Sequence, residues 1–248
     1  DPVQIFIGSS SNGEDAVSEN VYEYTLRKNM PDRPLGITWM RQTNIKEDFW
    51  YGFDTRHWST PFSGFRWAIP EACGFQGRAI YTDEDMVNNR NIGDLFDIDM
   101  QGKPFAARRG KRFGGHEFCV MVIDCGHQLF KDGLLAPAVR QKTIPEYHHR
   151  CIGAFSGSDA VLDLDPRWNC LDGEDLTFDE IWQLHWTKMA TQPWKPAWFK
   201  GKTEEHPRQD LVKKFNELCA EAAANGYDPG TRYGRYEVVP VQYNIIGQ

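Results

Sequence analysis

The sequence lacks two features that would place it in common structural classes: C-x-x-C cysteine pairs and long apolar runs. The missing C-x-x-C pairs argue against a zinc ribbon, and the spacing of the cysteines does not resemble a disulfide framework, which favours a reducing compartment. No run reaches the roughly 18 apolar residues that span a membrane, and no signal peptide is recognisable. We therefore expect a cytoplasmic protein without a transmembrane segment. The cysteines, several of which should pack as small core residues, are Cys73, Cys119, Cys125, Cys151, Cys170 and Cys219.

The chain also lacks an excess of basic residues. It carries 28 Lys and Arg against 35 Asp and Glu, a net charge of −7 at pH 7. Non-specific nucleic-acid binding depends on Lys and Arg that neutralise phosphates, so we expect no nucleic-acid partner. One local basic cluster is predicted to be a solvated loop rather than an anion site. It consists of Arg108, Arg109, Lys111 and Arg112.

The length and hydrophobic content suit one sizeable α/β core. With 248 residues, 40% of them hydrophobic, the chain can bury about 70–75% of its unfolded surface. Val3–Ile7 is typical of a buried strand, Gly8 and three serines end it, and Glu14–Asn29 has helical spacing. Strand, small-residue turn and helix open an α/β unit. The turn leaves backbone groups for a ligand, or it is a plain connection.

Further periodic segments continue the α/β pattern along the chain. Leu35–Met40, Phe105–Ala107 and Phe118–Ile123 are expected to be strands. Arg208–Asn225 has the apolar stripe of an amphipathic helix. The alternation of strands and helices, without an internal repeat, predicts an α/β fold.

Three consecutive acids, Asp83, Glu84 and Asp85, follow the apolar end of a predicted strand at Ala79–Tyr81. Side chains two apart on an extended chain point to the same side, so Asp83 and Asp85 should share one face and Glu84 the other. Two carboxylates on one face repel unless one keeps its proton or a cation lies between them. Carboxylate oxygens suit Mg²⁺ or Mn²⁺. The pattern fits either a metal site or a plain acidic turn.

Several longer segments share their order and spacing with one known family. They are FRWAIPEACGFQGRAIYTDEDMVNNRNIGDLFDIDM (Phe65–Met100), EFCVMVIDCGH (Glu117–His127), LDLDPRWNCL (Leu162–Leu171) and LHWTKMATQPWKP (Leu184–Pro196). Together they resemble the nucleotide-sugar glycosyltransferases of the GT-A fold, in particular the retaining family that includes glycogenin and bacterial galactosyltransferases (glycosyltransferase family eight-like). The resemblance covers most of Val3–Trp198. It implies a Rossmann-like mixed sheet flanked by helices.

The resemblance implies a metal-bound nucleotide sugar. Asp83 and Asp85 would hold a divalent ion, Mn or Mg, and through it the diphosphate of the donor. Asp85 and His185 would be direct metal ligands, and an imidazole beside carboxylates favours Mn over Mg. By itself, a His between Leu184 and Trp186 would be interpreted as a half-buried side chain with no ligand.

Other matching positions would contact the nucleotide or the sugar. Ile7, Gly8 and Ser9, at the end of the first strand, would contact base and ribose. Glu84 would lie with Asp83 among the residues that bind the diphosphate of the donor. Arg66 would reach the nucleotide or the donor sugar; its alternative is a surface Arg on a helix.

The lysine that binds phosphate in the family is missing. Gln192 stands in its place just before Pro-Trp. Lys188 or Lys195 could take over the contact with the diphosphate.

The family's sugar-contacting residues also differ here. Glu117 stands where the family usually has Asn. The Asp-Gln-Asp segment that borders the reacting carbon in the family is absent near Tyr147–Ser158, where His149 lies. The candidates for catalytic residues near the anomeric carbon are therefore Glu117, Arg66 and His149.

The resemblance implies a metal-dependent, retaining glycosyltransferase that moves a hexose from a nucleoside-diphosphate sugar, most simply a UDP-sugar. The acceptor would be a glycan, a lipid-linked glycan or another hydroxyl compound, as in polysaccharide biosynthesis. The aromatic segment Asn44–Ser63 could line a sugar site or be a packed loop. We expect residues 1–200 to form the transferase domain and residues 201–248 a C-terminal helix and tail.

Two other functions fit parts of the sequence. The altered sugar-contacting positions fit a nucleotide-sugar or glycan binding module that has lost catalysis. Asp83–Val87 also fits the Asp-x-Asp-x-Thr/Val pattern of haloacid-dehalogenase-like phosphatases, in which that motif usually lies on the first strand of the core domain.

Overall fold

A computed structural model describes residues 2–110, 114–131, 142–197 and 199–228 of the chain. Its centre is a six-stranded sheet of order β2-β1-β3-β6-β5-β7, and a three-stranded sheet has the order β4-β9-β8. The large sheet contains β1 (Val3–Gly8), β2 (Leu35–Met40), β3 (Arg78–Asp83), β5 (Phe105–Arg109), β6 (His116–Asp124) and β7 (Val161–Leu164). The small sheet contains β4 (Met86–Asn88), β8 (Cys170–Leu171) and β9 (Gln183–His185).

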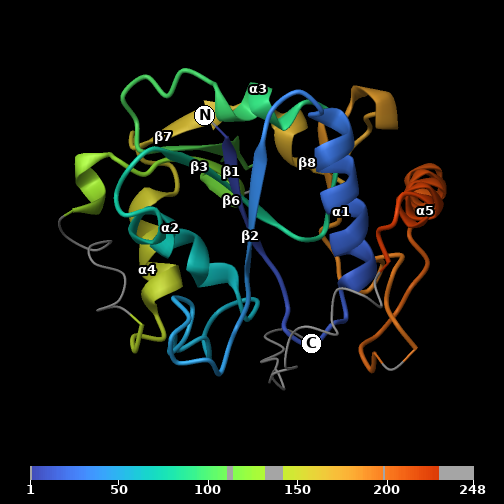
Figure 1. Cartoon of the computed structure of the whole chain (residues 1–248), viewed down its shortest axis with the longest axis horizontal. Coiled ribbons are helices and arrows are strands. Elements are labelled where there is room, and N and C mark those ends of the chain that lie inside the picture. Colours follow the sequence, from blue (N-terminus) through green and yellow to red (C-terminus); the bar gives the residue numbers. More distant parts are fainter. Residues whose placement is uncertain (1, 111–113, 132–141, 198, 229–248) are drawn as a thin grey trace.

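Helices cover both faces of the large sheet (Figure 1). The α-helices are α1 (Ala16–Asn29), α2 (Ile69–Ala72), α3 (Ile92–Phe96), α4 (Tyr147–Phe155) and α5 (Gln209–Ala224). Short 3₁₀ helices are η1 (Ser63–Ala68), η2 (Gln128–Phe130), η5 (Pro166–Asn169) and η6 (Phe178–Glu180). Side chains of α1 and α3 share one apolar core with one face of the sheet, and those of η1 and α4 share a second core with the other face.

The register of the strands fixes where the polar ends of the sheet meet. β1 pairs in parallel with both β2 and β3, whereas β6 runs antiparallel to β3. Gly8, the last residue of β1, is paired with Asp83, the last residue of β3. A Cβ at Gly8 would lie 2.5 Å from Cδ2 of Phe62, so this close approach requires glycine. The first turn of the chain therefore lies beside the acids.

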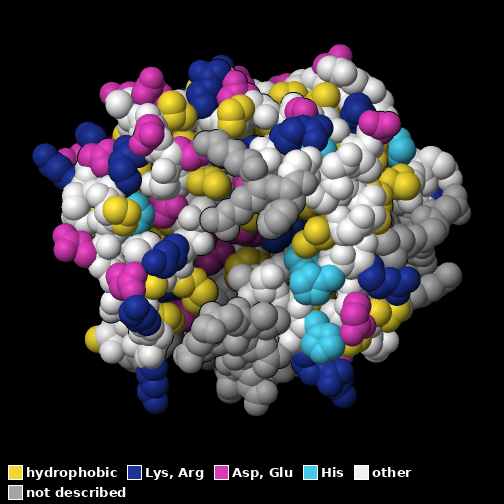
Figure 2. Space-filling model, turned by 180° about the vertical axis from the view of Figure 1, so that it is seen from behind, with side chains coloured by type: hydrophobic (Ala, Val, Ile, Leu, Met, Phe, Trp, Pro, Cys, Tyr) yellow, Lys and Arg dark blue, Asp and Glu magenta, His cyan; other side chains and the backbone are white. Residues whose placement is uncertain are grey.

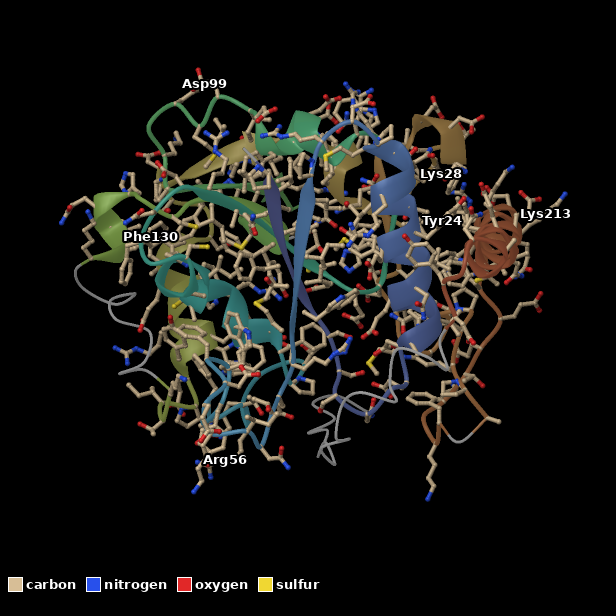
Figure 3. The ribbon with its side chains drawn as sticks, in the orientation of Figure 1. Tyr24, Lys28, Arg56, Asp99, Phe130 and Lys213 are labelled. Carbon is tan, nitrogen blue, oxygen red and sulfur yellow. The ribbon has the colours of Figure 1, made fainter. Side chains whose placement is uncertain are left out.

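A third apolar cluster lies outside the large sheet. Val21 of α1, Leu184 of β9 and Phe215 of α5 belong to it, together with Trp186 and Trp194. Figure 3 shows Tyr24 and Lys28 on the side of α1 that faces α5. Tyr24 donates a 2.7 Å hydrogen bond to Glu221 of α5, and Lys28 forms a 2.7 Å ion pair with the same carboxylate. The C-terminal helix thus packs on the α/β core.

The predicted α/β class and the long elements are confirmed, and one prediction is wrong. Arg108 is 1% exposed and belongs to β5, not to a solvated loop, because its charge is paired within the protein. Arg109, its neighbour in the same strand, has a half-exposed side chain. Lys111 and Arg112 lie outside the described residues. The predicted boundary after residue 200 stays a prediction.

The state of the cysteines and the distribution of surface charge agree with what the composition predicts. All six cysteines are free thiols. Figure 2 shows Lys and Arg side chains interspersed with Asp and Glu on the face seen from behind, without a broad basic area among the side chains coloured there. Among the residues that the structure describes, no helix combines the length and the apolar character needed to cross a bilayer.

Candidate metal and nucleotide site

Asp83 is held in place by two side chains that both use its Oδ1 atom. Arg66 lies 3.2 Å away through Nη2, and the Tyr81 hydroxyl donates to the same oxygen. Arg66 is 5% exposed because its other donors reach the carbonyl oxygens of Ser63 and Phe118. The interpretation of Arg66 as a surface residue is therefore wrong. The guanidinium of Arg66 is held in one orientation beside the carboxylate of Asp83.

His185 is brought to the acids by the small sheet. β4 and β9 are antiparallel, with Met86 paired to His185, so the residue before Met86 lies beside the imidazole. Nε2 of His185 lies 3.4 Å from Oδ1 of Asp85, and Nδ1 lies 2.9 Å from Oδ1 of Asn169. An amide oxygen only accepts hydrogen bonds, so Nδ1 carries the proton. Nε2 is left as a lone-pair donor aimed at Asp85.

Cys119 joins this group, although no sequence motif pointed to it. A carboxylate oxygen of Asp83, the Sγ atom of Cys119 and a ring nitrogen of His185 all lie within 4.8 Å of one another. Cys119 is on β6, where Thr82 of β3 pairs with Val120, so Cys119 stands next to the end of β3. The pairing of two strands distant in sequence determines this position. In the structure Glu117 and Cys119 are the partly exposed positions of this part of β6, but the sequence carries no local signal for this placement.

The three acidic side chains are largely buried, with Glu84 5% exposed and the side chains of Asp83 and Asp85 14% and 16% exposed. Burial, followed by the charge of Asp83, raises the pKa of Asp85 well above its ordinary value. Burial also raises the pKa of Glu84, with Asp85 as the next cause, and lowers the pKa of His185. Oδ1 of Asp85 and Oε2 of Glu84 are buried without a hydrogen-bond partner among the described residues.

A divalent cation fits this set of residues. Buried carboxylate oxygens without donors are costly unless a positive charge compensates them. A neutral imidazole that donates its second ring N–H to an oxygen acceptor is the usual form of a histidine ligand. Asp83, Asp85 and His185 together therefore offer oxygen and nitrogen atoms of the kind that bind Mn²⁺ or Mg²⁺.

The residues expected at the nucleotide lie at the end of β1, but their side chains are largely engaged. Ile7 is fully buried in the core. The Ser9 hydroxyl donates to Glu19, which also pairs with Arg41 at 2.8 Å. A contact from Ile7 and Gly8 to base and ribose would therefore come from their backbone.

The three positions considered for phosphate binding have different surroundings. Nε2 of Gln192 donates to Oδ2 of Asp85 at 3.0 Å, so this residue does reach the acids. Lys195 is buried against Asp15, 2.8 Å from its Oδ1, and its charge acts on Asp85. Lys188 has a mostly exposed side chain that pairs with Glu204 at 3.1 Å.

The structure brings one of the two remaining catalytic candidates toward the site. Oε2 of Glu117 lies 3.7 Å from Nε of Arg108, and Arg108 donates to the carbonyl oxygen of Asn169, the residue that orients His185. The described contacts of His149 are with His57 and the ring of His148. They do not reach the acids.

A separate large groove lies at the opposite end of the sheet. It has a volume of about 1010 Å³, and Gln4, Thr38, Arg78 and Asp124 are among its lining residues. Arg78 begins β3 and Asp83 ends it, a distance of about 16 Å at the usual rise of a strand. Ligands of open α/β sheets bind at the carboxyl ends of the strands, which favours the acidic end over this groove.

Comparison with known proteins identifies the fold but no sequence family. No protein-family model matches the sequence, and no curated protein matches it. The structure is similar to galactosyltransferase LgtC in complex with donor and acceptor sugar analogues, with a TM-score of 0.56 and 15% identity over 88% of this chain and 96% of LgtC. It is also similar to the bifunctional glycosyltransferase WbbM, with a TM-score of 0.62 and 12% identity over 95% of this chain and 52% of WbbM.

A third similar structure is the glycosyltransferase GlyE of Streptococcus pneumoniae TIGR4. Its TM-score is 0.50, with 13% identity over 91% of this chain and 65% of GlyE. The chain thus spans nearly all of LgtC and about half to two thirds of the two longer proteins. At these identities the likeness establishes the fold: the protein has the GT-A-like, Rossmann-like α/β fold of LgtC.

Proposed function

We propose that the protein is a metal-dependent glycosyltransferase that moves a hexose from a nucleoside-diphosphate sugar to a hydroxyl acceptor with retention of configuration. The observation that carries the proposal is the position of His185 at the carboxyl end of the sheet, 3.4 Å from Asp85 and within 4.8 Å of a carboxylate oxygen of Asp83. The same fold occurs in LgtC, which was solved with donor and acceptor sugar analogues. A UDP-sugar donor is proposed because the sequence resembles the retaining family that includes glycogenin and bacterial galactosyltransferases.

The proposed metal ligands are Asp83, Asp85 and His185, with Mn preferred over Mg. Bound there, the ion would supply Lewis-acid stabilisation of the departing diphosphate, an effect worth several kcal/mol. Arg66 and Tyr81 hold Asp83 in one orientation, and Asn169 holds His185. Because these groups are fixed before a donor arrives, little reorganisation is needed when negative charge develops.

Glu117, which lies beside Arg108, is proposed to face the sugar. Glu117 offers Oε2, which is buried without a hydrogen-bond partner among the described residues, and this oxygen can accept a hydrogen bond from a sugar hydroxyl. Placing the acceptor hydroxyl in line with the anomeric carbon supplies much of the remaining rate. Lys195, whose Nζ lies 2.8 Å from Oδ1 of Asp15, is proposed to add positive charge near the diphosphate.

A nucleotide-sugar binding module without turnover is the second candidate. It is favoured by Gln192, a neutral side chain that donates to Asp85 where the family has a phosphate-binding lysine. The contacts of His149 also point away from the acids. The phosphatase alternative loses support, since the fold is that of LgtC and β3 lies inside the sheet rather than opening the chain.

Metal-dependent nucleotide binding tests the proposal. We expect Mn²⁺ to be required for stabilisation by one of UDP, GDP or CMP in a thermal shift experiment, by about 2.7 kcal/mol at a ligand concentration 100 times Kd. Asp85→Asn and His185→Ala should abolish this Mn²⁺-dependent stabilisation. The matched control is Asp94→Asn, which removes a surface acid and should bind as the wild type does.

Two results would count against the proposal in different ways. If no nucleotide stabilises the protein with Mn²⁺, or if both ligand variants bind normally, the metal site is wrong. If a nucleotide binds with Mn²⁺ but UDP-hexoses are neither transferred to added sugars nor hydrolysed, the protein is the binding module. Product detection by mass spectrometry separates these cases.

A further inference from the structure

Cys119 differs from the other cysteines in its surroundings. Cys125, Cys151 and Cys170 are fully buried, as expected for small core residues. Cys119 is partly buried, like Cys73 and Cys219, but its sulfur alone lies among the ligand atoms of Asp83 and His185 in the described part of the chain. Among the described residues, this is the single group of three His, Cys, Asp or Glu side chains with a spacing suited to an ion.

The distances allow one ion to contact the sulfur as well as the oxygen and nitrogen. Around one ion with metal–ligand bonds of about 2.0 to 2.3 Å, ligand atoms at tetrahedral angles lie roughly 3.3 to 3.8 Å apart. The three atoms lie within 4.8 Å of one another, so inward shifts of less than about 1 Å per atom bring all three onto one ion. The cysteine is held by the pairing of β6 with β3, which keeps the sulfur at this spacing.

We propose that Cys119 is a direct ligand of the cation, which makes the site a mixed oxygen, nitrogen and sulfur centre. This inference rests on the metal site of the proposed function. Sulfur ligands favour soft and borderline ions such as Co²⁺ and Zn²⁺, whereas Mg²⁺ is bound by oxygen ligands. The centre therefore binds Co²⁺ and Zn²⁺ more tightly than an all-oxygen site would, and Cys119 contributes little to the affinity for Mg²⁺.

Cobalt spectroscopy tests the sulfur bond directly. Co²⁺ added to the metal-free full-length protein should give a sulfur-to-cobalt charge-transfer band in the near ultraviolet, together with visible d–d bands. In Cys119→Ser the charge-transfer band should disappear, and the affinities for Co²⁺ and Zn²⁺ should fall at least tenfold, the lower limit for losing even an indirect partner of a ligand. The affinity for Mg²⁺ should change less than threefold.

Cys73→Ser is the matched control. Cys73 is a partly buried free cysteine that lines the groove at the opposite end of the sheet, so its replacement removes a thiol away from Asp83 and His185. The control should keep the charge-transfer band. If the band survives in Cys119→Ser and is lost in Cys73→Ser, the inference is wrong.

The remaining outcomes separate this inference from the proposed function. Visible cobalt bands that depend on Asp85 and His185 but lack the charge-transfer component would overturn the role of Cys119 and leave the metal site standing. No cobalt binding, together with no Mn²⁺-dependent nucleotide binding, would overturn both.

A measurement on the wild type covers the case in which Cys119→Ser does not fold. Iodoacetamide labelling followed by mass spectrometry reports the alkylation rate of each cysteine. Zn²⁺ should slow alkylation of Cys119 at least tenfold while leaving that of Cys219, a partly buried cysteine on α5, unchanged. Equal rates at Cys119 with and without Zn²⁺ would contradict a sulfur–metal bond.

Discussion

At the scale of single residues, the side chains of the site are oriented by partners that are themselves buried. Asn169 is fully buried and fixes which nitrogen of His185 carries the proton. Arg66 stacks over the ring of Tyr81 at 4.3 Å while both bind Asp83. Partners of this kind fix the protonation form and the orientation of the side chains that bind a metal.

His148 is a buried imidazole on α4, and it should make stability depend on pH. Burial, with a smaller contribution from the charge of Arg66, lowers its pKa to about 2. Nδ1 accepts a 3.0 Å hydrogen bond from Nε1 of Trp67, which requires the neutral ring. The unfolded chain binds a proton at His148 near pH 6.5 and the folded protein does not, so folding stability falls as pH drops below that value.

We predict that this histidine costs the wild type about 2 kcal/mol of unfolding free energy between pH 7.5 and pH 5. His148→Asn keeps a hydrogen-bond acceptor for Trp67 and cannot titrate in this range, so it should lack this part of the loss. Urea unfolding at the two pH values measures the difference. The exposed His57 provides the control, His57→Asn, which should behave as the wild type does. Equal losses in the wild type and His148→Asn would show that the ring is protonated in the folded protein.

The sequence predicted part of the site, and the limit has a physical reason. Asp83, Asp85 and His185 could be grouped because they stand at fixed places in an ordered series of motifs, and in the structure His185 lies close to each of the two aspartates. Their ligand roles stay a prediction. Cys119 could not be found this way, since its place depends on the register between β3 and β6, which local periodicity does not determine.

At the scale of elements, β5 directs the side chains of two adjacent arginines to opposite faces of the sheet. Successive side chains of a strand point to opposite faces, and the register shifts between Ala107 and Arg108. Arg108 turns inward, where Nη2 lies 2.5 Å from Oε1 of Glu174. Arg109 turns outward to Asp163 at 3.0 Å, and both side chains of that pair are about half exposed.

The two arginines should therefore differ sharply in their effect on stability. Arg108→Gln leaves the carboxylate of Glu174 without its buried partner and should lower the unfolding free energy by about 3 to 5 kcal/mol. Arg109→Gln breaks a solvent-screened pair and should cost about 1 kcal/mol or less. Urea unfolding of both variants at neutral pH gives the comparison. Similar losses would mean that Arg108 is solvated, as the run of basic residues first indicated.

Most elements that show a clear period could be predicted, whereas the shortest strands and α4 could not. The bounds of β2 were those expected, and those of β1, α1 and α5 differ from the expected ones by one or two residues, because each has enough residues to show a period. β4, β8 and β9 have two or three residues each, and such pieces become strands only through their partners. The position of His185 depends on one of these pairings.

At the scale of the whole molecule, aromatic packing connects the C-terminal helix to the site. Phe215 of α5 is 1% exposed, and its ring centroid lies 5.7 Å from that of Trp186 and 5.4 Å from that of Trp194. Trp186 directly follows His185 in the chain. Loss of this packing should therefore affect the element that carries the imidazole, not only the C-terminal helix.

We predict that Phe215→Ala lowers the free energy of unfolding by about 3 to 5 kcal/mol in a single transition. The cavity would open between α5, α1 and the small sheet, whose side chains form one cluster, so these parts should lose stability together. Tryptophan fluorescence and far-ultraviolet circular dichroism should report the same midpoint during denaturation. Lys213→Ala, on the exposed outer side of α5 (Figure 3), is the control and should change stability by about 0.5 kcal/mol or less. A separate early transition in Phe215→Ala, with the main transition unchanged, would instead mean that the segment after residue 200 folds as a unit of its own.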